Sequence, residues 1–257
     1  MPANLTLSTG LLFGFLLTVA RVAGIFIFVP LPGLRSAPDQ ARVVLVLAVA
    51  VALFPRWPAV DAGTVTPFRA AGWMAAEAAT GVAIGLAVAI VLEGFALAAQ
   101  VLGLQAGYAY ASTIDPNTQA DSGVLLVFAE LAAGLLFFAA GGDRELLRLV
   151  ARSLETAPAG AWAFSPASAG PVIRLGAGMF AVGLRLAFPV VALLIMVDLA
   201  LALAGRIHSQ LQLLSLAFPV KMLAALAMLS WGAVLFPRLL RESGGAAWTT
   251  LGHLLGL

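Results

Sequence analysis

The chain contains no cysteine, and His208 and His253 are its only histidines. The absence of cysteine excludes disulfides, thiolate zinc sites and cysteine nucleophiles. With so few imidazoles, we expect neither metal chemistry nor any cofactor. Charged residues are also scarce, at 10% of 257 residues, whereas a soluble domain has about a quarter. An ordinary cytosolic enzyme is therefore excluded.

Basic stripes and nucleotide motifs are missing as well. The net charge is only +2, the arginines are scattered, and Lys221 is the sole lysine, so we expect no nucleic-acid partner. No phosphate-binding loop of the GxxxxGK[ST] type occurs, so the chain is not expected to hydrolyse ATP. Neither histidine has a serine or carboxylate at motif spacing, which argues against an enzyme.

Arg21 interrupts the first apolar run, and no positive residue precedes that run, so a cleaved signal peptide is a poor interpretation.

Hydrophobic residues dominate what is present, at 62% of the chain. This composition predicts one all-α membrane domain over residues 1–257, with about six hydrophobic helices. Membrane β-strands are disfavoured, because no regular two-residue alternation appears. The third apolar stretch is long enough for two segments or one bent hairpin. The apolar stretches are Leu11–Pro30, Val43–Phe54, Ala70–Tyr110, Val124–Ala140, Leu175–Ala204 and Leu213–Phe236.

The segments between these stretches carry distinct signals. Residues 157–171 are rich in Pro, Ala, Ser and Gly and read as a long loop. Residues 112–122 form the only long polar patch in the apolar middle of the chain, with turn chemistry. Residues 143–155 predict an amphipathic helix at the membrane surface with Leu147, Val150 and Leu154 as its apolar stripe, or a plain charged extension of a neighbouring helix. The arginines of this helix place it on the cytoplasmic side and residues 115–121 on the opposite side.

Ionisable residues lie inside the apolar segments. A charge at bilayer depth costs at least about 2.5 to 3.5 kcal/mol on insertion scales, so each must face protein, water or a counter-charge. Acids and bases are nearly balanced, which favours salt bridges between helices or subunits over a proton or ion relay. These residues are Arg21, Glu77, Glu93, Glu130, Arg185, Asp198 and Lys221.

Prolines and glycines accompany these charges. Pro189 and Pro219 lie within apolar runs, where each removes a helix hydrogen bond and predicts a bent or broken helix. Two glycine pairs, 81 with 85 and 103 with 107, place small residues on one helical face and permit close helix approach. For both pairs, packing within the chain is the favoured interpretation, and contact with a partner chain is the alternative. Together these features indicate a multi-subunit assembly or a channel.

Four stretches carry a resemblance that covers most of the chain. They are residues 21–35, with Arg21, Pro30 and Arg35; residues 103–116, which read Gly-Leu-Gln-Ala-Gly and end in Asp115-Pro116; residues 198–206, from Asp198 to Arg206; and Gln210 with Phe218-Pro219-Val220-Lys221. In these stretches the chain resembles the FliR family of type III secretion export-gate subunits. Two departures, Gly141-Gly142-Asp143-Arg144 in place of an Asn-Gly-His-like turn and Ser209 in place of a proline, leave open whether the system is flagellar or an injectisome.

The resemblance implies partners and a location. It implies helical hairpins within a hetero-oligomeric helical assembly with FliP and FliQ type subunits, next to FlhB and FlhA type proteins. The assembly would lie in the bacterial inner membrane at the flagellar basal body, among membrane lipids, and would pass unfolded proteins as cargo. Energy would come from the proton-motive force and a separate ATPase. Arg206 joins the intramembrane charges as a candidate for subunit contacts.

The same resemblance implies a plug loop at residues 103–123 that closes the pore. The residues to which this role transfers are Gln105, Gly107, Tyr108, Thr113, Asp115, Pro116 and Asn117. A polar loop bounded by Gly and Pro and flanked by apolar helices cannot face lipid, so it must line a cavity or lie at the surface. A plain exposed turn is the alternative interpretation.

Two other functions remain open at this point. An injectisome export-apparatus homologue would share the same chemistry. A secondary transporter for a small molecule also tolerates intramembrane charges and broken helices, although such transporters usually show internal repeats and more spans. A membrane enzyme lacks any constellation of catalytic residues.

Overall fold

The structure is a computed structural model that describes residues 8–29, 38–60, 63, 65–108, 124–156, 160, 166–207, 213–232, 234 and 236–255. Every regular element in these residues is helical, which confirms the expected all-α fold. The chain divides into two compact units, which are described separately: one comprises residues 1–90, 141–175 and 244–257, and the other residues 91–140 and 176–243.

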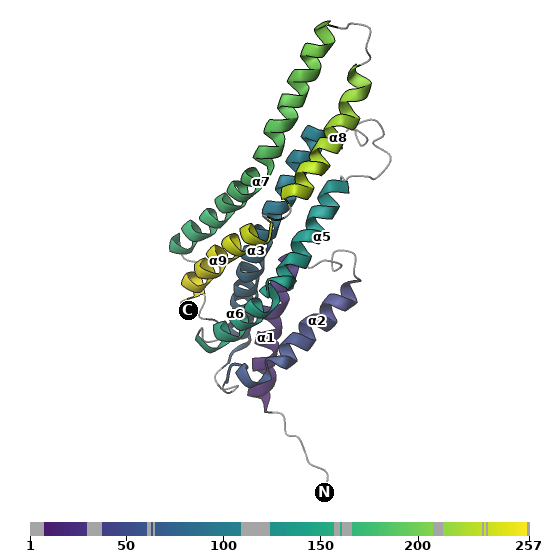
Figure 1. Cartoon of the computed structure of the whole chain (residues 1–257). Coiled ribbons are helices and arrows are strands. Elements are labelled where there is room, and N and C mark those ends of the chain that lie inside the picture. The colour runs from purple at the N-terminus through teal and green to yellow at the C-terminus, as the bar shows by residue number, and fades with distance from the viewer. Residues whose placement is uncertain are drawn as a thin grey trace. The chain divides into compact units, whose positions relative to one another are not determined.

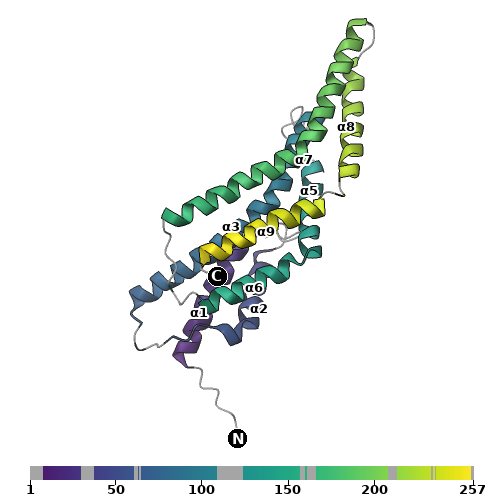
Figure 2. The same cartoon turned by 60° about the vertical axis from the view of Figure 1, so that its left-hand side comes forward.

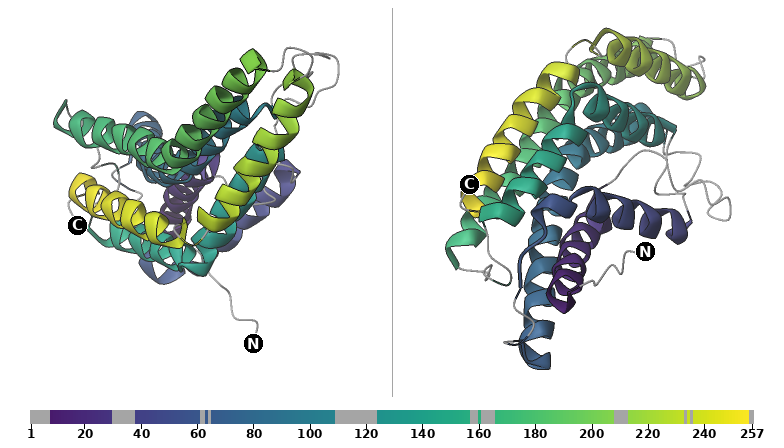
Figure 3. Two further views of the ribbon diagram at one scale, coloured as in Figure 1. Left: turned by 45° about the horizontal axis from the view of Figure 1, so that its top comes forward. Right: turned by 90° about the horizontal axis from the view of Figure 1, so that it is seen from below.

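The first unit contains α1 (Thr9–Phe28), α2 (Asp39–Ala52), the 3-10 turn η1 (Phe54–Arg56), the first part of α3 (Pro67–Ala106) and α6 (Gly142–Thr156). Ser8 caps α1 by accepting a hydrogen bond from the backbone N–H of Leu11. Pro67 opens α3 after Thr66, whose hydroxyl accepts from the backbone N–H of Arg69. Figure 1 and the right-hand view of Figure 3 show α1 along the first part of α3, with α2 beside it.

Glycine sets the distance between α1 and α3. A Cβ added to Gly81 would collide with the carbonyl oxygen of Arg21, and one added to Gly85 with that of Ile25. The backbones therefore approach more closely than any larger residue permits. The predicted role of this glycine pair, packing within the chain, is confirmed. For Gly103, by contrast, an added Cβ would meet no described atom within 4 Å.

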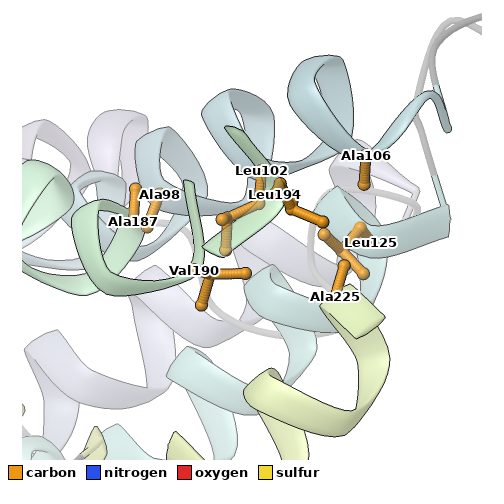
Figure 4. Close-up of a cluster of buried hydrophobic side chains, with 8 residues drawn as sticks. All are labelled: Ala98, Leu102, Ala106, Leu125, Ala187, Val190, Leu194 and Ala225. Carbon is orange, nitrogen blue, oxygen red and sulfur yellow. The ribbon is translucent and has the colours of Figure 1, made fainter. Parts of the chain in front are cut away.

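The second unit contains the rest of α3, α5 (Val124–Ala139), the later part of α7 (Pro166–Ile207), α8 (Leu213–Gly232) and the start of α9 (Phe236–Leu255). Figure 2 shows the later part of α7 and α8 side by side, running in opposite directions. Four helices supply its core, as Figure 4 shows, and small residues alternate there with large ones. The core side chains are Ala98, Leu102, Ala106, Leu125, Ala187, Val190, Leu194 and Ala225.

Several element boundaries differ from the expectations. The long third stretch is one continuous helix, α3, because no proline, asparagine or aspartate interrupts residues 68–106. Residues 166–171, expected within a loop, already belong to α7, whose Pro166 suits a first turn. An additional helix, α9, follows the last predicted stretch. Residues 143–155 lie within a helix, α6, whose buried face contains Leu146, Val150 and Leu154, whereas Leu147, expected on that face, is exposed. Its place at the membrane surface stays a prediction.

Three of the described helices are long and apolar enough to cross a membrane: α1, α3 and residues 170–206 of α7. The count rises to four if α5 and α6 form one broken span. Pro189 and Pro219 lie inside α7 and α8, and both helices continue past them. Neither helix is broken at its proline, and of the two predicted outcomes, a bend or a break, Figure 1 shows a bend in α7.

Candidate functional site

A buried ion pair connects three elements of the first unit. The guanidinium of Arg21 in α1 donates through Nε to Oε2 of Glu77 in α3, with a separation of 2.5 Å. Its Nη1 donates to the hydroxyl of Ser153 in α6 at 2.9 Å. The second carboxylate oxygen of Glu77 accepts from the backbone N–H of Gly160 at 3.1 Å. We call these four residues the buried cluster.

Burial makes this cluster energetically important. Arg21 and Glu77 are each 1% exposed and Ser153 is fully buried. Within the described residues, no fully buried side-chain nitrogen or oxygen lacks a hydrogen-bond partner. Removing one partner of such a pair costs about 3 to 5 kcal/mol, because a buried charge is left uncompensated. The cluster therefore holds α1, α3 and α6 in one arrangement.

A second ion pair lies in the second unit and is more accessible. Nζ of Lys221 in α8 is 2.9 Å from Oδ2 of Asp198 in α7, and Nε2 of Gln105 in α3 donates to the same oxygen at 3.3 Å. The Lys221 side chain is 13% exposed and that of Asp198 is 43% exposed. We call these three residues the open cluster. It joins three helices, as the first does, but keeps a carboxylate at the surface.

The end of α3 is fixed beside the open cluster. The N–H of Tyr108 bonds to the carbonyl of Gly103 and that of Gly107 to the carbonyl of Leu104, the paired bonds of a Schellman motif. Gly107 has φ +88°, a left-handed conformation that glycine adopts without strain. The hydroxyl of Tyr108 donates to the carbonyl of Met222 in α8 at 3.2 Å. Partial burial raises the pKa of Tyr108, which keeps this hydroxyl protonated as a donor.

Only some of the predicted plug residues lie in the part of the chain that the structure describes. The structure brings together Gln105, Gly107 and Tyr108 at the end of α3. Thr113, Asp115, Pro116 and Asn117 lie outside the described residues. The closing contacts of the loop therefore stay a prediction.

The remaining predicted charges lie in different surroundings. Glu93 is exposed and Glu130 is half-buried. Arg185 and Arg206 are exposed on α7, and neither forms an ion pair within the part of the chain that the structure describes. No group of three or more metal-ligating side chains occurs among the described residues.

Sequence reasoning missed Ser153 and Gly160 as members of the buried cluster. Ser153 lies three residues after Val150 and next to Leu154 on the buried face of α6. A serine on an apolar face signals a polar partner there, since a buried hydroxyl without one is costly. Gly160 contributes only its backbone N–H, and no side-chain pattern reveals such a donor.

The comparisons with known proteins agree with one another on a single family. A sequence model of the family described as "Bacterial export proteins, family 1" matches residues 12–244. The flagellar biosynthetic protein FliR of Escherichia coli (strain K12) is 27% identical over 211 residues, which are 82% of this chain and 80% of the relative. The protein of the same name from Bacillus subtilis (strain 168) is 27% identical over 231 residues, covering 84% of each chain. That of Caulobacter vibrioides is 22% identical over 83% of this chain and 86% of its own length.

Proposed function

The chain belongs to family 1 of the bacterial export proteins, and on that premise we propose how it serves as a subunit of the flagellar type III protein export gate. The match of the family over residues 12–244 is the observation that carries this function. The relatives described above are all named as flagellar proteins, which favours the flagellar system over an injectisome. The chain is a membrane-bound component of the flagellar export apparatus.

The proposed partners are FliP and FliQ type subunits, with FlhB and FlhA type proteins next to them in the bacterial inner membrane. The surface of α7 supports this assignment. In the apolar 18-residue stretch that qualifies it as a candidate span, only 17% of the residues are buried within the chain. Large apolar side chains such as Phe188, Met196 and Leu203 are more than half exposed, so this helix has surface available for sibling subunits or lipid.

In this proposal the chain performs no catalytic step and holds no cofactor. Its task is to form part of a passage for unfolded flagellar proteins, while the proton-motive force and a separate ATPase supply energy. The buried cluster keeps the helices of the first unit in register. Arg185 and Arg206, exposed on α7, are available to carboxylates of neighbouring subunits.

The plug role of residues 103–123 is also part of the proposal. The Schellman motif at Gly107 and the hydroxyl bond of Tyr108 to Met222 fix the point from which the segment leaves α3. Gln105 adds a tie to the open cluster. A segment held at a fixed point is suited to closing a passage and reopening without a chemical step.

Co-purification from native membranes tests the function. We expect an affinity-tagged copy of the full chain to restore flagellar protein secretion in a strain lacking its gene, and to purify with several other small hydrophobic proteins. A self-sufficient monomer or homodimer that binds a small solute would instead identify a secondary transporter. Native mass measurement of the purified species separates these outcomes.

Deletion of residues 110–120 tests the plug. Ion leakage across the membrane should rise when the assembled gate lacks this segment, and also when a Gly/Ser linker of equal length replaces it. The substitution Tyr108→Phe, which removes only the bond to Met222, should raise leakage less. Unchanged leakage in a fully assembled complex would refute the plug.

A further inference from the structure

The end of α3 is attached to two other helices by polar contacts that form a closed ring. Gln105 donates through Nε2 to Oδ2 of Asp198 in α7 at 3.3 Å, and the hydroxyl of Tyr108 donates to the carbonyl of Met222 in α8 at 3.2 Å. Lys221, the residue before Met222, binds the same Asp198 oxygen at 2.9 Å. We call these five residues the polar ring.

The polar ring begins where the apolar core of the second unit ends. Ala106 is fully buried in that core together with Leu194 of α7 and Ala225 of α8, as Figure 4 shows. Asp198 follows Leu194 by about one helical turn, and Lys221 precedes Ala225 by about one turn. Polar contacts between the three helices therefore take over from apolar packing at the point where residues 103–123 leave α3.

The Schellman motif alone does not place this segment against its neighbours. Its two hydrogen bonds, from the N–H groups of Gly107 and Tyr108, run back into α3 itself. They determine where the helix ends but not how that end sits relative to α7 and α8. Leu104 in the same turn is 71% exposed, so apolar packing holds the turn from one side only. The side chains of Gln105 and Tyr108 supply the missing attachment.

The ion pair in the polar ring is suited to opening and closing. The side chain of Lys221 is 13% exposed and that of Asp198 is 43% exposed. A partly solvated pair contributes little net free energy, because water replaces the contact when it breaks. The pair of Arg21 and Glu77 lacks this property, since both residues are 1% exposed. The polar ring can therefore hold a position and still be broken and remade.

From these observations we propose that Asp198 and Lys221 are positioning residues for the plug. They hold Gln105 in place, and the contact breaks when the gate opens. The inference rests on the plug role proposed above for residues 103–123 and adds a means of releasing it. Loss of the ion pair lets α7 move away from α8, and the end of α3 cannot then stay bound to both Asp198 and Met222.

Ion leakage through the assembled gate tests this inference. Gln105→Leu removes the donor but keeps the ion pair, and leakage should rise several-fold, though less than on deletion of residues 110–120. Lys221→Met should raise leakage to a similar extent by freeing α7 from α8. Gln100→Leu, at an exposed position five residues earlier in α3, is the matched control and should leak like the wild type. Native mass measurement confirms assembly of each variant.

A charge exchange separates positioning from a general loss of structure. Asp198→Lys and Lys221→Asp should each raise leakage, because each places like charges on α7 and α8. The double variant should return leakage to near the wild-type level, since the ion pair forms again in reverse. Gln105 can follow this exchange, because its amide offers a carbonyl acceptor to a lysine as well as a donor to a carboxylate.

Cross-linking tests the movement directly, because the chain contains no cysteine of its own. Gln105→Cys combined with Asp198→Cys, joined by a short bis-methanethiosulfonate reagent, should lower leakage and block secretion until a reductant is added. Gly94→Cys with Val182→Cys is the control pair, since a Cβ on Gly94 would lie 3.4 Å from that of Val182. It joins the same two helices about three turns from the plug and should leave secretion unchanged.

The outcomes distinguish this inference from the plug itself. Wild-type leakage in Gln105→Leu and Lys221→Met, with raised leakage after deletion of residues 110–120, would overturn the inference and leave the plug intact. No effect of the deletion would overturn both. An equal block of secretion by the two cross-linked pairs would also overturn the inference, because the whole of α3 rather than its end would then have to move.

Discussion

The buried cluster and the open cluster use the same chemistry in different surroundings. In each, an acid on one helix meets a base on another, and a polar side chain from a third helix completes the group. The first acid is 1% exposed, whereas the side chain of Asp198 in the second is 43% exposed. Burial, rather than the type of contact, therefore separates a group that holds helices in place from one that stays accessible to solvent or a partner.

The largest expected effect is that of Glu77→Ala. It leaves the guanidinium of Arg21 buried without a counter-charge and should lower the free energy of unfolding by about 3 to 5 kcal/mol. Unfolding in mixed micelles, followed by circular dichroism, measures the change. The double variant Arg21→Met/Glu77→Leu should recover most of the loss, because an apolar pair of similar volume removes both charges. A loss below about 1 kcal/mol in the single variant would contradict the structural role of the cluster.

Gly81→Ala tests the close helix approach that brings Arg21 to Glu77. In a helix interior, alanine normally stabilises relative to glycine by about 0.5 to 1 kcal/mol. Here the added methyl collides with the carbonyl of Arg21, so we expect a loss of about 1 to 3 kcal/mol instead. Gly176→Ala in α7 is the matched control, since its methyl would meet no described atom within 4 Å. If both substitutions stabilise the chain, the contact between α1 and α3 is not as close as described.

The open cluster should respond more weakly and depend on salt. A double-mutant cycle with Asp198→Ala and Lys221→Ala should give a coupling energy of about 1 kcal/mol or less, because the carboxylate is partly solvated. That coupling should fall further in 1 M salt, where the Debye length is about 3 Å. The coupling between Arg21 and Glu77 should change little under the same conditions. Equal salt dependence of the two pairs would remove the distinction between the clusters.

The smallest effect is expected for an exposed pair in the first unit. Nε of Arg56 lies 2.5 Å from Oε1 of Glu155, but these side chains are 48% and 52% exposed. Arg56→Gln should change the free energy of unfolding by about 0.5 kcal/mol or less, as is typical of surface ion pairs. A loss comparable to that of Glu77→Ala would mean that burial does not determine how much each ion pair contributes to the free energy of unfolding.

Much of the helical content was predictable from composition. Runs of alanine, leucine and valine predicted the helices from α1 to α8, and acids before arginines predicted α6. The continuity of α3 was also available from the sequence, since no proline, asparagine or aspartate lies within residues 68–106. Its length of about 60 Å, twice the thickness of the hydrocarbon core, argued instead for a hairpin. The helix α9 was missed because Glu242, Ser243 and two glycines lower its hydropathy.

The sequence predicted that the intramembrane charges form pairs, but not which residues pair. Near-balance of acids and bases indicated salt bridges, and within the described residues two pairs of these intramembrane charges form one, Arg21 with Glu77 and Asp198 with Lys221. Asp198 and Lys221 pair with each other, whereas the sequence alone equally allowed contacts between these residues and partner subunits. The sequence does not show which helices are neighbours, and Arg21 is 56 residues away from its partner Glu77. Contacts made by backbone groups, such as those of Gly160 and Met222, leave no side-chain signature.

The separation within the buried cluster imposes an order on biogenesis. Arg21 emerges from the ribosome 56 residues before Glu77 and 132 residues before Ser153. At about 5 to 20 residues per second, the acid follows the base by about 3 to 11 seconds. During that interval the first helix must keep its guanidinium in contact with water or headgroups, since hydrocarbon offers no substitute. We therefore expect the first helix to complete its insertion only when the third has arrived, so that the two integrate into the membrane together.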